Sequence, residues 1–516
     1  EEPLMSAHTI ADPDASISRD DLELLARKGA AALGNLGAEP DDAVAIIMRN
    51  DLASVEIMRA VALAGVVGVP LNWHGAAQEV SDILDDSKSN IVIIHRDLIP
   101  PIASALEGKT VIGVTPPPAL KTAYKISDEA AATGSAPEWS DLVEAAELVA
   151  DRLRMRAMMR YTSGSTGKPK GIKRLPKKGA EPQDFYATMR HIAPNMFFYR
   201  PDARFMTAAP LYHSAPSTLA AMAVAMEDMS AYVLPRFEPI SFLETIEREK
   251  ITHIYLVPTM MTRLLKLPED VKAKYDLSSV EFCVSTGSPW PHDVKVAMID
   301  WWGPVFWETY GASEIGFMTM VSSQEALDRP GTAGRIQLGG SIRIYSPEGE
   351  LLPTGEVGDI HVRMDVFGEF DYSNDPEGRQ HSEIDSHVSV GDMGWLDEDG
   401  FLFITDRKKD MIISGGANIF PTEIEAVLID APFIQDVAVF GAPDPEFGEK
   451  IVAAVQAMPG WEANEAEVRD WLEGRLARFK HPRIIDFHDA LPREDSGKIF
   501  KPRLRAPYWE GAGRSI

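Results

Sequence analysis

The order of apolar and polar positions predicts alternating helices and strands over the first 150 residues. Apolar residues recur at helical spacing over Leu22–Leu36, and the pattern ends where Gly37 begins a turn. Three short apolar runs, Val44–Met48, Val66–Leu71 and Ile91–Ile94, are typical of buried strands, and Glu56–Leu63 is helical. Strands interleaved with helices indicate an α/β domain with a largely parallel sheet.

The pattern changes in the second half of the large domain. Polar and apolar positions alternate over Ser341–Arg363, with turns at Pro347–Gly349 and Pro353–Gly355. We therefore expect antiparallel strands that form a small β-barrel-like subdomain closing the large domain. Two polar stretches, Thr115–Trp139 and Phe367–Ser389, have the composition of surface loops.

The segment from Met411 onward predicts a second, smaller domain of typical size. A helix over Thr422–Leu428, a strand over Val437–Val439 and a helix over Asn464–Phe479 give it an α+β pattern. The fold class expected for the whole chain is therefore α/β. It comprises a large N-terminal domain of α/β subdomains and a smaller, mobile α+β C-terminal domain.

Composition narrows the classes of function. A chain of 516 residues is long enough for at least two domains. A net charge of −27 argues against nucleic-acid binding and against attraction to anionic membranes. The longest apolar run, Val61–Leu71, is too short to span a bilayer. The single cysteine, Cys283, excludes an internal disulfide framework and a Cys-based zinc cluster. We expect a cytoplasmic protein without an integral membrane segment.

A run of glycines, hydroxyls and lysines, YTSGSTGKPKG, spans Tyr161–Gly171 after a largely apolar lead-in. The glycines let backbone amides turn toward one point, and the Ser and Thr side chains add further donors. Lys168 and Lys170 add positive charge. A loop of this composition suits a polyphosphate, whose oxygens all carry the same charge.

The composition of this loop allows two other interpretations. The phosphate loop GxxxxGK[ST] fails at both ends, because Thr162 stands where the first glycine is needed and Pro169 follows the lysine. A flexible Gly/Ser surface turn is the plainer alternative. Other segments of the chain decide between this alternative and a phosphate site.

Separated motifs along the chain resemble those of the adenylate-forming enzymes, the superfamily of acyl-CoA synthetases, luciferases and peptide-synthetase adenylation domains. TSGSTGKPKG resembles the family signature, and FWETYGASEIG contains the family's YGxTE core with Ser313 where threonine is usual. FITDRKKDMIISGGANIF and the C-terminal LPREDSGKIFK match later family segments in the same order. The resemblance covers nearly the whole chain and indicates the acyl-CoA synthetase branch.

The resemblance implies a nucleotide and metal site. Tyr310 is expected to stack on adenine, Asp392 and Arg407 to reach the ribose, and Glu314 to bind Mg²⁺ that bridges the phosphates. A hard divalent cation prefers carboxylate and phosphate oxygens, which agrees with a glutamate at this position. The full set expected to contact ATP or AMP is Thr162, Ser163, Gly164, Ser165, Thr166, Gly167, Lys170, Gly287, Ser288, Glu308, Thr309, Tyr310, Gly311, Ser313, Asp392 and Arg407.

The acyl site is also given by resemblance. His213, in the segment MTAAPLYHSAP, matches the position that gates the acyl pocket in this family. Ser214, Ala215 and Met260 are expected to line the same pocket, and the small residues after His213 leave room for a bulky acyl group.

A mobile C-terminal domain completes the expected enzyme. Lys498 matches the catalytic lysine, so the expected catalytic residues are Lys498, His213 and Glu314. Lys409 matches the hinge position, which divides the chain into an adenylation and acyl-binding domain over residues 1–408 and a lid domain over residues 409–516. Coenzyme A is expected at Gly415, Gly416 and Phe479, although His481 stands where an arginine is expected.

These parts favour an ATP-dependent acyl-CoA synthetase that uses ATP, Mg²⁺ and coenzyme A. An ionised carboxylate needs no general base to attack the α-phosphate, so most of the catalytic task is electrostatic. A freestanding adenylation enzyme that loads a carrier protein is the alternative, while a luciferase-type monooxygenase has no particular support. The small-molecule substrate is expected to be a hydrophobic fatty, aryl or polycyclic (bile- or steroid-type) carboxylic acid, and the resemblance is compatible with a homodimer.

Overall fold

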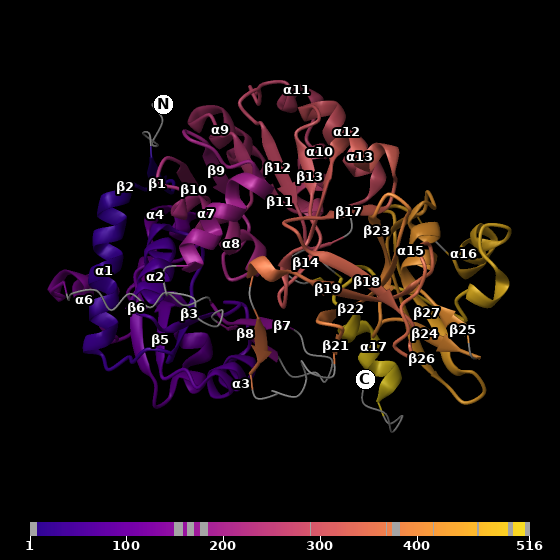
Figure 1. Cartoon of the computed structure of the whole chain (residues 1–516), viewed down its shortest axis with the longest axis horizontal. Helices are drawn as coiled ribbons and strands as arrows, with labels where there is room; N and C mark the ends of the chain where they lie inside the picture. Colours follow the sequence, from indigo (N-terminus) through magenta and orange to yellow (C-terminus); the bar gives the residue numbers. More distant parts are fainter. Residues whose placement is uncertain are drawn as a thin grey trace.

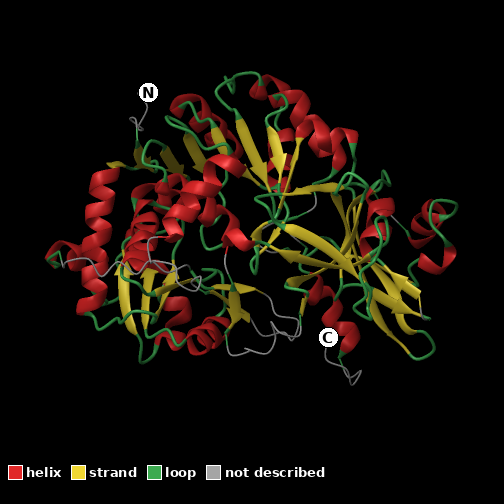
Figure 2. Ribbon diagram, viewed as in Figure 1, coloured by secondary structure: helices red, strands yellow, loops and turns green. Residues whose placement is uncertain are grey.

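The computed structural model describes residues 8–148, 158–162, 170–175, 184–288, 290–367, 369–373, 382–415, 417–461, 464–493 and 499–510. The N-terminal elements lie at the left of Figure 1, and the C-terminal elements lie at the right. Figure 2 shows strands of the central sheet with helices on both of its faces.

Four parallel strands in the order β4-β3-β5-β6 form the first sheet. They are β3 (Ala43–Ile47), β4 (Val67–Pro70), β5 (Ile91–His95) and β6 (Thr110–Val114). Alternate residues of β3 enter different cores, since Val44 and Ile46 pack in one apolar cluster while Ala45 and Ile47 pack in another. A sheet buried on both faces needs continuous apolar runs, which explains the predicted strands.

Helices cover both faces of this sheet. They are α1 (Arg19–Asn35), α2 (Leu52–Leu63), α3 (Ala77–Ser87) and α6 (Trp139–Ala145). Helix α1 begins at Ser18, whose hydroxyl accepts from the backbone N–H of Asp21, and acidic residues in the first turn favour that end. The expected helices and strands of this region are therefore confirmed to within a few residues.

A larger sheet has a parallel half and an antiparallel half. The parallel half follows the order β13-β12-β11-β9-β10-β1, with β2 antiparallel at the edge. Its strands are β1 (Thr9–Ala11), β2 (Ser16–Ser18), β9 (Arg204–Thr207), β10 (Ser230–Val233), β11 (His253–Leu256), β12 (Phe282–Ser285) and β13 (Phe306–Glu308). Its helices are α7 (Asp184–Phe197), α8 (Ser214–Ala225), α9 (Pro239–Glu249), α10 (Pro258–Leu265), α11 (Glu269–Lys272) and α12 (His292–Trp302).

The antiparallel half continues from β13 through β16 and contains the strands expected over Ser341–Arg363. Its order is β16-β17-β23-β22-β19-β18, and β21 pairs with β22. The strands are β16 (Thr319–Ser322), β17 (Thr332–Ile336), β18 (Ser341–Tyr345), β19 (Gly358–Arg363), β21 (Glu383–Ile384), β22 (His387–Leu396) and β23 (Phe401–Arg407). Helix α13 (Ser323–Asp328) follows β16. The antiparallel region expected to close the large domain thus runs on from the parallel strands.

Two smaller sheets lie beside it. Strands β7 (Arg160–Thr162), β8 (Lys170–Arg174) and β20 (Phe370–Tyr372) pair antiparallel, as do β14 (Gly311–Ala312) and β15 (Gly316–Phe317).

The C-terminal region has its own sheet and core. The strands are β24 (Ile412–Ser414), β25 (Ala417–Ile419), β26 (Ile434–Asp444), β27 (Gly448–Ala457) and β28 (Ile484–Phe487), in the order β25-β24-β27-β26 with β28 parallel to β27. Helices α15 (Pro421–Ile429), α16 (Glu465–Leu472) and α17 (Lys501–Trp509) pack around it.

Three expectations about local structure were wrong. Thr115–Trp139 is not a surface loop throughout, because α4 (Pro118–Tyr124) and α5 (Asp128–Ala131) form there and Trp139 is buried. In Phe367–Ser389, β20 and β21 pair with strands of the large domain. The helix expected over Asn464–Phe479 ends at Leu472, and Gly474 with φ +75° then turns the chain.

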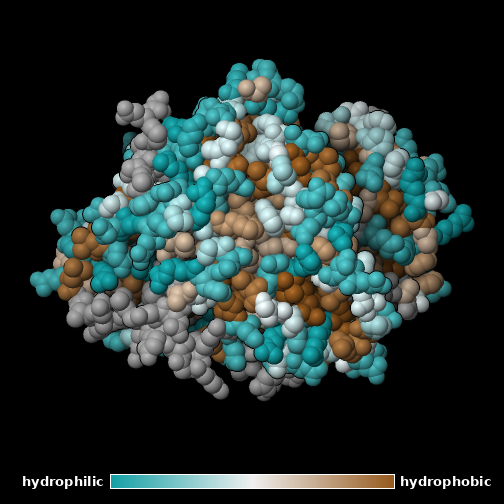
Figure 3. Space-filling view, turned by 45° about the horizontal axis from the view of Figure 1, so that its top comes forward, coloured by the Kyte–Doolittle hydropathy of each residue, from teal (hydrophilic) through white to brown (hydrophobic). Residues whose placement is uncertain are grey.

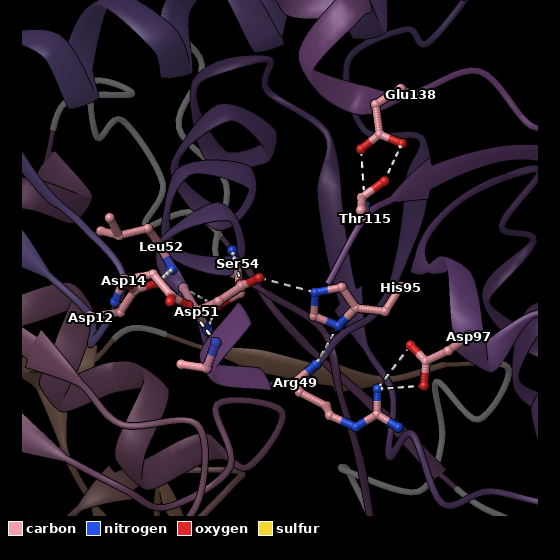
Figure 4. A network of polar contacts seen from close by, with 11 residues as sticks. Asp12, Asp14, Arg49, Asp51, Leu52, Ser54, His95, Asp97, Thr115 and Glu138 are labelled. Carbon is pink, nitrogen blue, oxygen red and sulfur yellow. Dashed lines mark hydrogen bonds and ion pairs between the residues drawn. The ribbon is translucent and has the colours of Figure 1, made fainter. Parts of the chain in front are cut away.

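A buried polar network joins the first sheet to the N-terminal strands (Figure 4). His95 Nε2 lies 3.0 Å from the carboxylate of Asp51, and the Nδ1 atom of the same ring accepts from the backbone N–H of Arg49. Asp12 accepts from the backbone N–H of Leu52 at 2.9 Å. These contacts fix the start of α2.

Asn50 joins the two parallel sheets at their carboxyl ends. Its amide nitrogen donates to the carbonyls of Ala209 (2.9 Å) and Leu234 (3.2 Å), and its oxygen accepts from the N–H of Leu211 at 2.9 Å. All of these groups are buried, so a lost partner would be costly. The segment that leads to His213 is held by these bonds.

The surface is largely polar. Figure 3 shows apolar surface gathered toward the middle of one face, within a mostly hydrophilic rim. Among the described residues, the helices are too short or too polar to cross a bilayer.

Candidate active site

The carboxyl ends of β9, β11, β12 and β13 open into one cleft of about 3150 Å³. Parallel strands place their carboxyl ends at the same edge of a sheet, which is where open α/β sheets bind ligands. The cleft is also lined by residues of β22 and β23 and by parts of the C-terminal region. It therefore brings together segments from distant parts of the sequence.

Most of the residues expected to contact the nucleotide line this cleft. Of that set, the lining includes Lys170, Gly287, Ser288, Glu308, Thr309, Tyr310, Gly311, Ser313, Asp392 and Arg407, together with Glu314. Thr162 lies in β7, while Ser163, Gly164, Ser165, Thr166 and Gly167 lie outside the described residues.

Tyr310 and Asp392 contact each other directly across the cleft. The Tyr310 hydroxyl donates to the Asp392 carboxylate, and Arg407 Nε lies 3.8 Å from the same carboxyl group. Burial, and then the Asp392 charge, raise the pKa of Tyr310 well above its usual value, so the phenol keeps its proton. The residues expected at adenine and at ribose thus form one connected group.

Glu314 lies in a buried part of the cleft. Its carboxylate accepts from the Tyr372 hydroxyl at 3.2 Å. Burial raises the pKa of Glu314, while the Tyr372 bond and the charges of Arg174 and Arg407 oppose that shift. A desolvated carboxylate gains from a cationic ligand, because burial penalises its uncompensated charge.

A single protein carboxylate fits Mg²⁺ only when other ligands come from elsewhere. In the described part of the chain, no group of three or more His, Cys, Asp or Glu side chains is placed to hold a metal by itself. Mg²⁺ is commonly bound by one or two carboxylates plus substrate phosphates and water, and Glu314 fits that pattern.

Glu308 already has a partner within the protein. Lys295 of α12 donates to its carboxylate at 2.7 Å. Burial raises the pKa of Glu308, and the Lys295 charge opposes the shift. Glu308 was expected to contact ATP, and in the structure its contact with Lys295 fixes β13 to α12.

The expected acyl residues divide between the cleft and the core. His213, Ser214 and Ala215 line the cleft at the start of α8. Met260 is not among the lining residues and packs against the two cores of the large sheet. Its neighbours Thr259 and Thr262 reach the cleft, because α10 turns them to another face.

Two of the residues expected to bind coenzyme A, Gly415 and Phe479, lie apart from the cleft lining. Gly415 is in the turn between β24 and β25 with φ +58°, and Phe479 is 60% exposed in a 3-10 turn. Neither belongs to the cleft lining, whereas the expected hinge residue Lys409 does. Gly416 and the expected catalytic residue Lys498 lie outside the described residues.

Two arginines of the cleft were not expected from the sequence. Arg160 and Arg174 flank the Gly/Ser loop, and burial lowers the pKa of each to about 10. Arg174 Nη2 donates to the carbonyl of Ser313 at 3.2 Å. The available signal was an arginine within a short stretch that is typical of a strand. Most arginines are exposed to solvent, so an arginine in such a stretch indicates a special role.

Comparison with known proteins agrees with this arrangement. Residues 4–367 match the family model "AMP-binding enzyme", and residues 423–498 match "AMP-binding enzyme C-terminal domain". The chain is 29% identical over 524 residues to the long-chain-fatty-acid–CoA ligase FadD13 of Mycobacterium tuberculosis, covering 98% of this chain and 96% of that protein. It is 31% identical over 507 residues to a feruloyl-CoA synthase of an Amycolatopsis species, covering 97% and 96%.

The fold is also similar to a solved structure. ATP-bound MatB from Rhodopseudomonas palustris superposes with a TM-score of 0.82 at 27% identity, covering 100% of this chain and 97% of that chain.

Proposed function

The chain belongs to the AMP-binding enzyme family, and from this premise we propose that it is an AMP-forming acid–CoA ligase. It converts a carboxylic acid, ATP and coenzyme A into an acyl-CoA, AMP and pyrophosphate. The observation that carries the proposal is the shared cleft, in which His213, Tyr310, Glu314 and Asp392 come together from three separate segments.

The first step forms an acyl-adenylate. A carboxylate oxygen of the acid attacks the α-phosphorus, the bond to the β-phosphate oxygen breaks, and pyrophosphate leaves with that electron pair. Tyr310 and the Asp392–Arg407 pair hold the nucleoside, and Lys498 neutralises charge that grows on the phosphate. Holding two anions together accounts for most of the barrier, so orientation and fixed positive charge carry the catalysis.

Glu314 would hold Mg²⁺ at the phosphates, where the ion supplies charge neutralisation. The buried position of its carboxylate and the Tyr372 hydroxyl that orients it support this role. ATP phosphates and water would complete the coordination shell.

The second step transfers the acyl group to sulfur. The coenzyme A thiol releases its proton to solvent, its sulfur attacks the acyl carbon, and the carbon–oxygen bond to AMP breaks, so that AMP leaves with that electron pair. In our proposal, residues 409–516 form a lid domain that turns about Lys409 and brings Gly415, Gly416 and Phe479 to the acyl-adenylate. Gly415 and Phe479 do not line the cleft, which supports the need for a second arrangement of the two domains.

The substrate we propose is an acid with a sizeable apolar body, of the fatty, aryl or polycyclic class. Small residues at Ser214 and Ala215 leave room beside His213. The relatives named above act on acids of different shapes, and this variety agrees with a pocket adapted in each protein. An amino acid is less suitable, since the acyl segment 213–221 contains no carboxylate for an α-ammonium group.

A panel of carboxylic acids with ATP and Mg²⁺ tests the proposal, with pyrophosphate measured in the presence and absence of coenzyme A. Acyl-CoA and AMP should appear in equal amounts when coenzyme A is present. Adenylates trapped by hydroxylamine, without acyl-CoA formation, would favour transfer to a carrier protein instead. Pyrophosphate release from none of the acids would refute the proposal.

A further inference from the structure

Arg160 lies in strand β7, immediately before the Gly/Ser loop, and its side chain faces away from those of its neighbours. Met159 is buried against the first sheet, and Tyr161 donates its hydroxyl to Asp86 of α3 at 2.6 Å. Alternate residues of a strand point to opposite faces, so Arg160 points toward α8. There it lines the cleft beside His213.

The guanidinium of Arg160 has only neutral partners. Nη1 donates to the carbonyl of Tyr212 at 3.2 Å, and Nη2 donates to the hydroxyl of Ser217 at 2.5 Å. In the described part of the chain, no carboxylate forms an ion pair with it. A guanidinium has five N–H donors, so these two contacts leave donor capacity unused. Burial lowers its pKa to about 10, which still leaves it charged at neutral pH.

Arg19, the first residue of α1, provides a comparison because it contacts the other end of α8. It also has a pKa lowered to about 10 by burial, and it donates to the carbonyls of Ala223 and Val224 at the C-terminal end of α8. Those carbonyls carry the negative end of the helix dipole, and they account for a cation at that place. Arg19 is not among the residues that line the cleft.

Arg160 lies at the opposite end of α8, where the helix dipole is positive. Neither the dipole nor a carboxylate offsets its charge there, although a buried charge is costly unless it is paired. The lining of the cleft that contains this cation also has apolar residues. They include Val55, Met58, Met158, Met189, Ala221 and Val224.

We propose that Arg160 binds an oxygen acceptor on the body of the acyl substrate, remote from the carboxylate that is activated. The preferred acids would then combine an apolar frame with a carbonyl, hydroxyl or second carboxylate. This inference rests on the proposed acid–CoA ligase function and narrows its substrate class. It assigns Arg160 as a specificity-determining residue.

The test uses matched pairs of acids on three frames. The pairs are decanoic and 9-oxodecanoic acid, 3-phenylpropanoic and 3-(4-hydroxyphenyl)propanoic acid, and cyclohexanecarboxylic and 4-oxocyclohexanecarboxylic acid. Decanedioic acid is added to separate a second carboxylate from a neutral acceptor. The measured quantity is kcat/KM for pyrophosphate release by the full-length enzyme.

On the frame with the highest activity, the wild-type enzyme should prefer the oxygenated acid at least tenfold. Arg160→Met should reduce that preference at least tenfold by raising KM for the oxygenated acid, with a much smaller change in KM for ATP. Arg19→Met is the matched control, because it removes an arginine of α1 that contacts the other end of α8. It should lower the melting temperature but keep the wild-type preference.

Other results overturn the inference. Equal losses on both members of a pair in Arg160→Met would indicate contact with the reacting carboxylate or the phosphates. If the wild type shows no preference for the oxygenated acid, or if Arg160→Met keeps that preference, Arg160 only stabilises α8. Pyrophosphate release without a preference rejects this inference alone, whereas no release from any acid rejects the proposed function as well.

Discussion

The ammonium nitrogen of Lys295 lies 2.7 Å from the carboxylate of Glu308, and both side chains are largely buried, with exposures of 7% and 16%. The pair joins helix α12 to strand β13, which leads directly into Tyr310. Lys295 also lies 5.3 Å from the ring centre of Trp290. The position of the nucleotide motif therefore depends on a buried ion pair behind it.

Replacing only one partner of this pair should lower the free energy of unfolding more than replacing both partners. Lys295→Met leaves the Glu308 carboxylate buried and unpaired, and we expect it to lower the free energy of unfolding by about 3 kcal/mol. The double variant Lys295→Met/Glu308→Leu removes both charges and should recover most of that loss. Urea denaturation of the wild type, both single variants and the double variant gives the coupling energy. Additive losses in the double variant would argue against a coupled buried pair.

The elements of the first sheet could be predicted because their apolar pattern is dictated by burial on both faces. Residues such as Val44 and Ala45 pack in different cores, so continuous apolar runs were the expected signal. The helices in Thr115–Trp139 could not be predicted in the same way. They are short, and tertiary contacts stabilise them, such as the bond from the Tyr124 hydroxyl of α4 to the carbonyl of Pro235 at 3.1 Å.

The candidate site also contains some residues that could be predicted from the sequence and some that could not. Tyr310, Glu314 and Asp392 lie in motifs with a recognisable order, and the fold brings them into one cleft. Arg160 and Lys295 belong to no such motif, and their importance arises from contacts with residues distant in the sequence. Met260 was expected in the pocket because methionines pack into pockets as well as into cores, but the side of a helix that faces a cavity depends on packing.

The hydrogen bond between Tyr310 and Asp392 should contribute to nucleotide binding. Tyr310→Phe keeps the aromatic ring but removes the donor that orients the carboxylate. We expect KM for ATP to rise roughly fivefold to tenfold, which corresponds to about 1 kcal/mol, with a small change in KM for the acid. Initial rates at varied ATP check this. An unchanged KM for ATP would mean that Asp392 needs no orientation by Tyr310.

Glu314 should set the requirement for Mg²⁺. Glu314→Gln keeps the shape of the side chain but removes the charge, so we expect kcat/KM for pyrophosphate release to fall roughly 100-fold and the Mg²⁺ needed for half-maximal rate to rise. Tyr372→Phe removes only the hydrogen bond at 3.2 Å and should have an effect of about fivefold. A magnesium titration of each variant separates these outcomes. Wild-type magnesium dependence in Glu314→Gln would exclude this residue as a ligand.

His253 should make the fold sensitive to acid. Burial lowers its pKa to about 4, and the hydrogen bond that its Nε2–H donates to the carbonyl of Phe198 at 3.0 Å only partly opposes that shift. The unfolded state therefore binds a proton at higher pH than the folded state, and stability falls as pH drops from about 6.5 toward 4. The loss attributable to this group is roughly 3 kcal/mol when complete.

Unfolding by urea at pH 7.5 and pH 5 measures that loss. His253→Gln cannot be protonated and should show a smaller decrease between the two pH values than the wild type. His191→Gln, at an exposed position of α7, is the control and should behave like the wild type. Equal decreases in His253→Gln and the wild type would assign the acid sensitivity to other groups.

Lys498 should matter for one half-reaction only. Lys498 lies outside the described residues. The three residues that follow it, Ile499, Phe500 and Lys501, are described and line the cleft. Lys501 pairs with Glu425 of α15 at 2.8 Å and so fixes this segment to the C-terminal region. We therefore expect the C-terminal domain, which we propose to move, to bring the ammonium of Lys498 to the phosphates. Lys498→Ala should slow adenylate formation roughly 100-fold or more, because it removes a charge that stabilises the transition state. Thioester formation from preformed acyl-adenylate should stay within a few-fold of the wild type, since that step no longer involves pyrophosphate departure.

Separate assays of pyrophosphate release and of acyl-CoA formation from synthetic acyl-adenylate distinguish the two half-reactions. Equal losses in both assays would contradict an enzyme that uses one arrangement of its domains for each step.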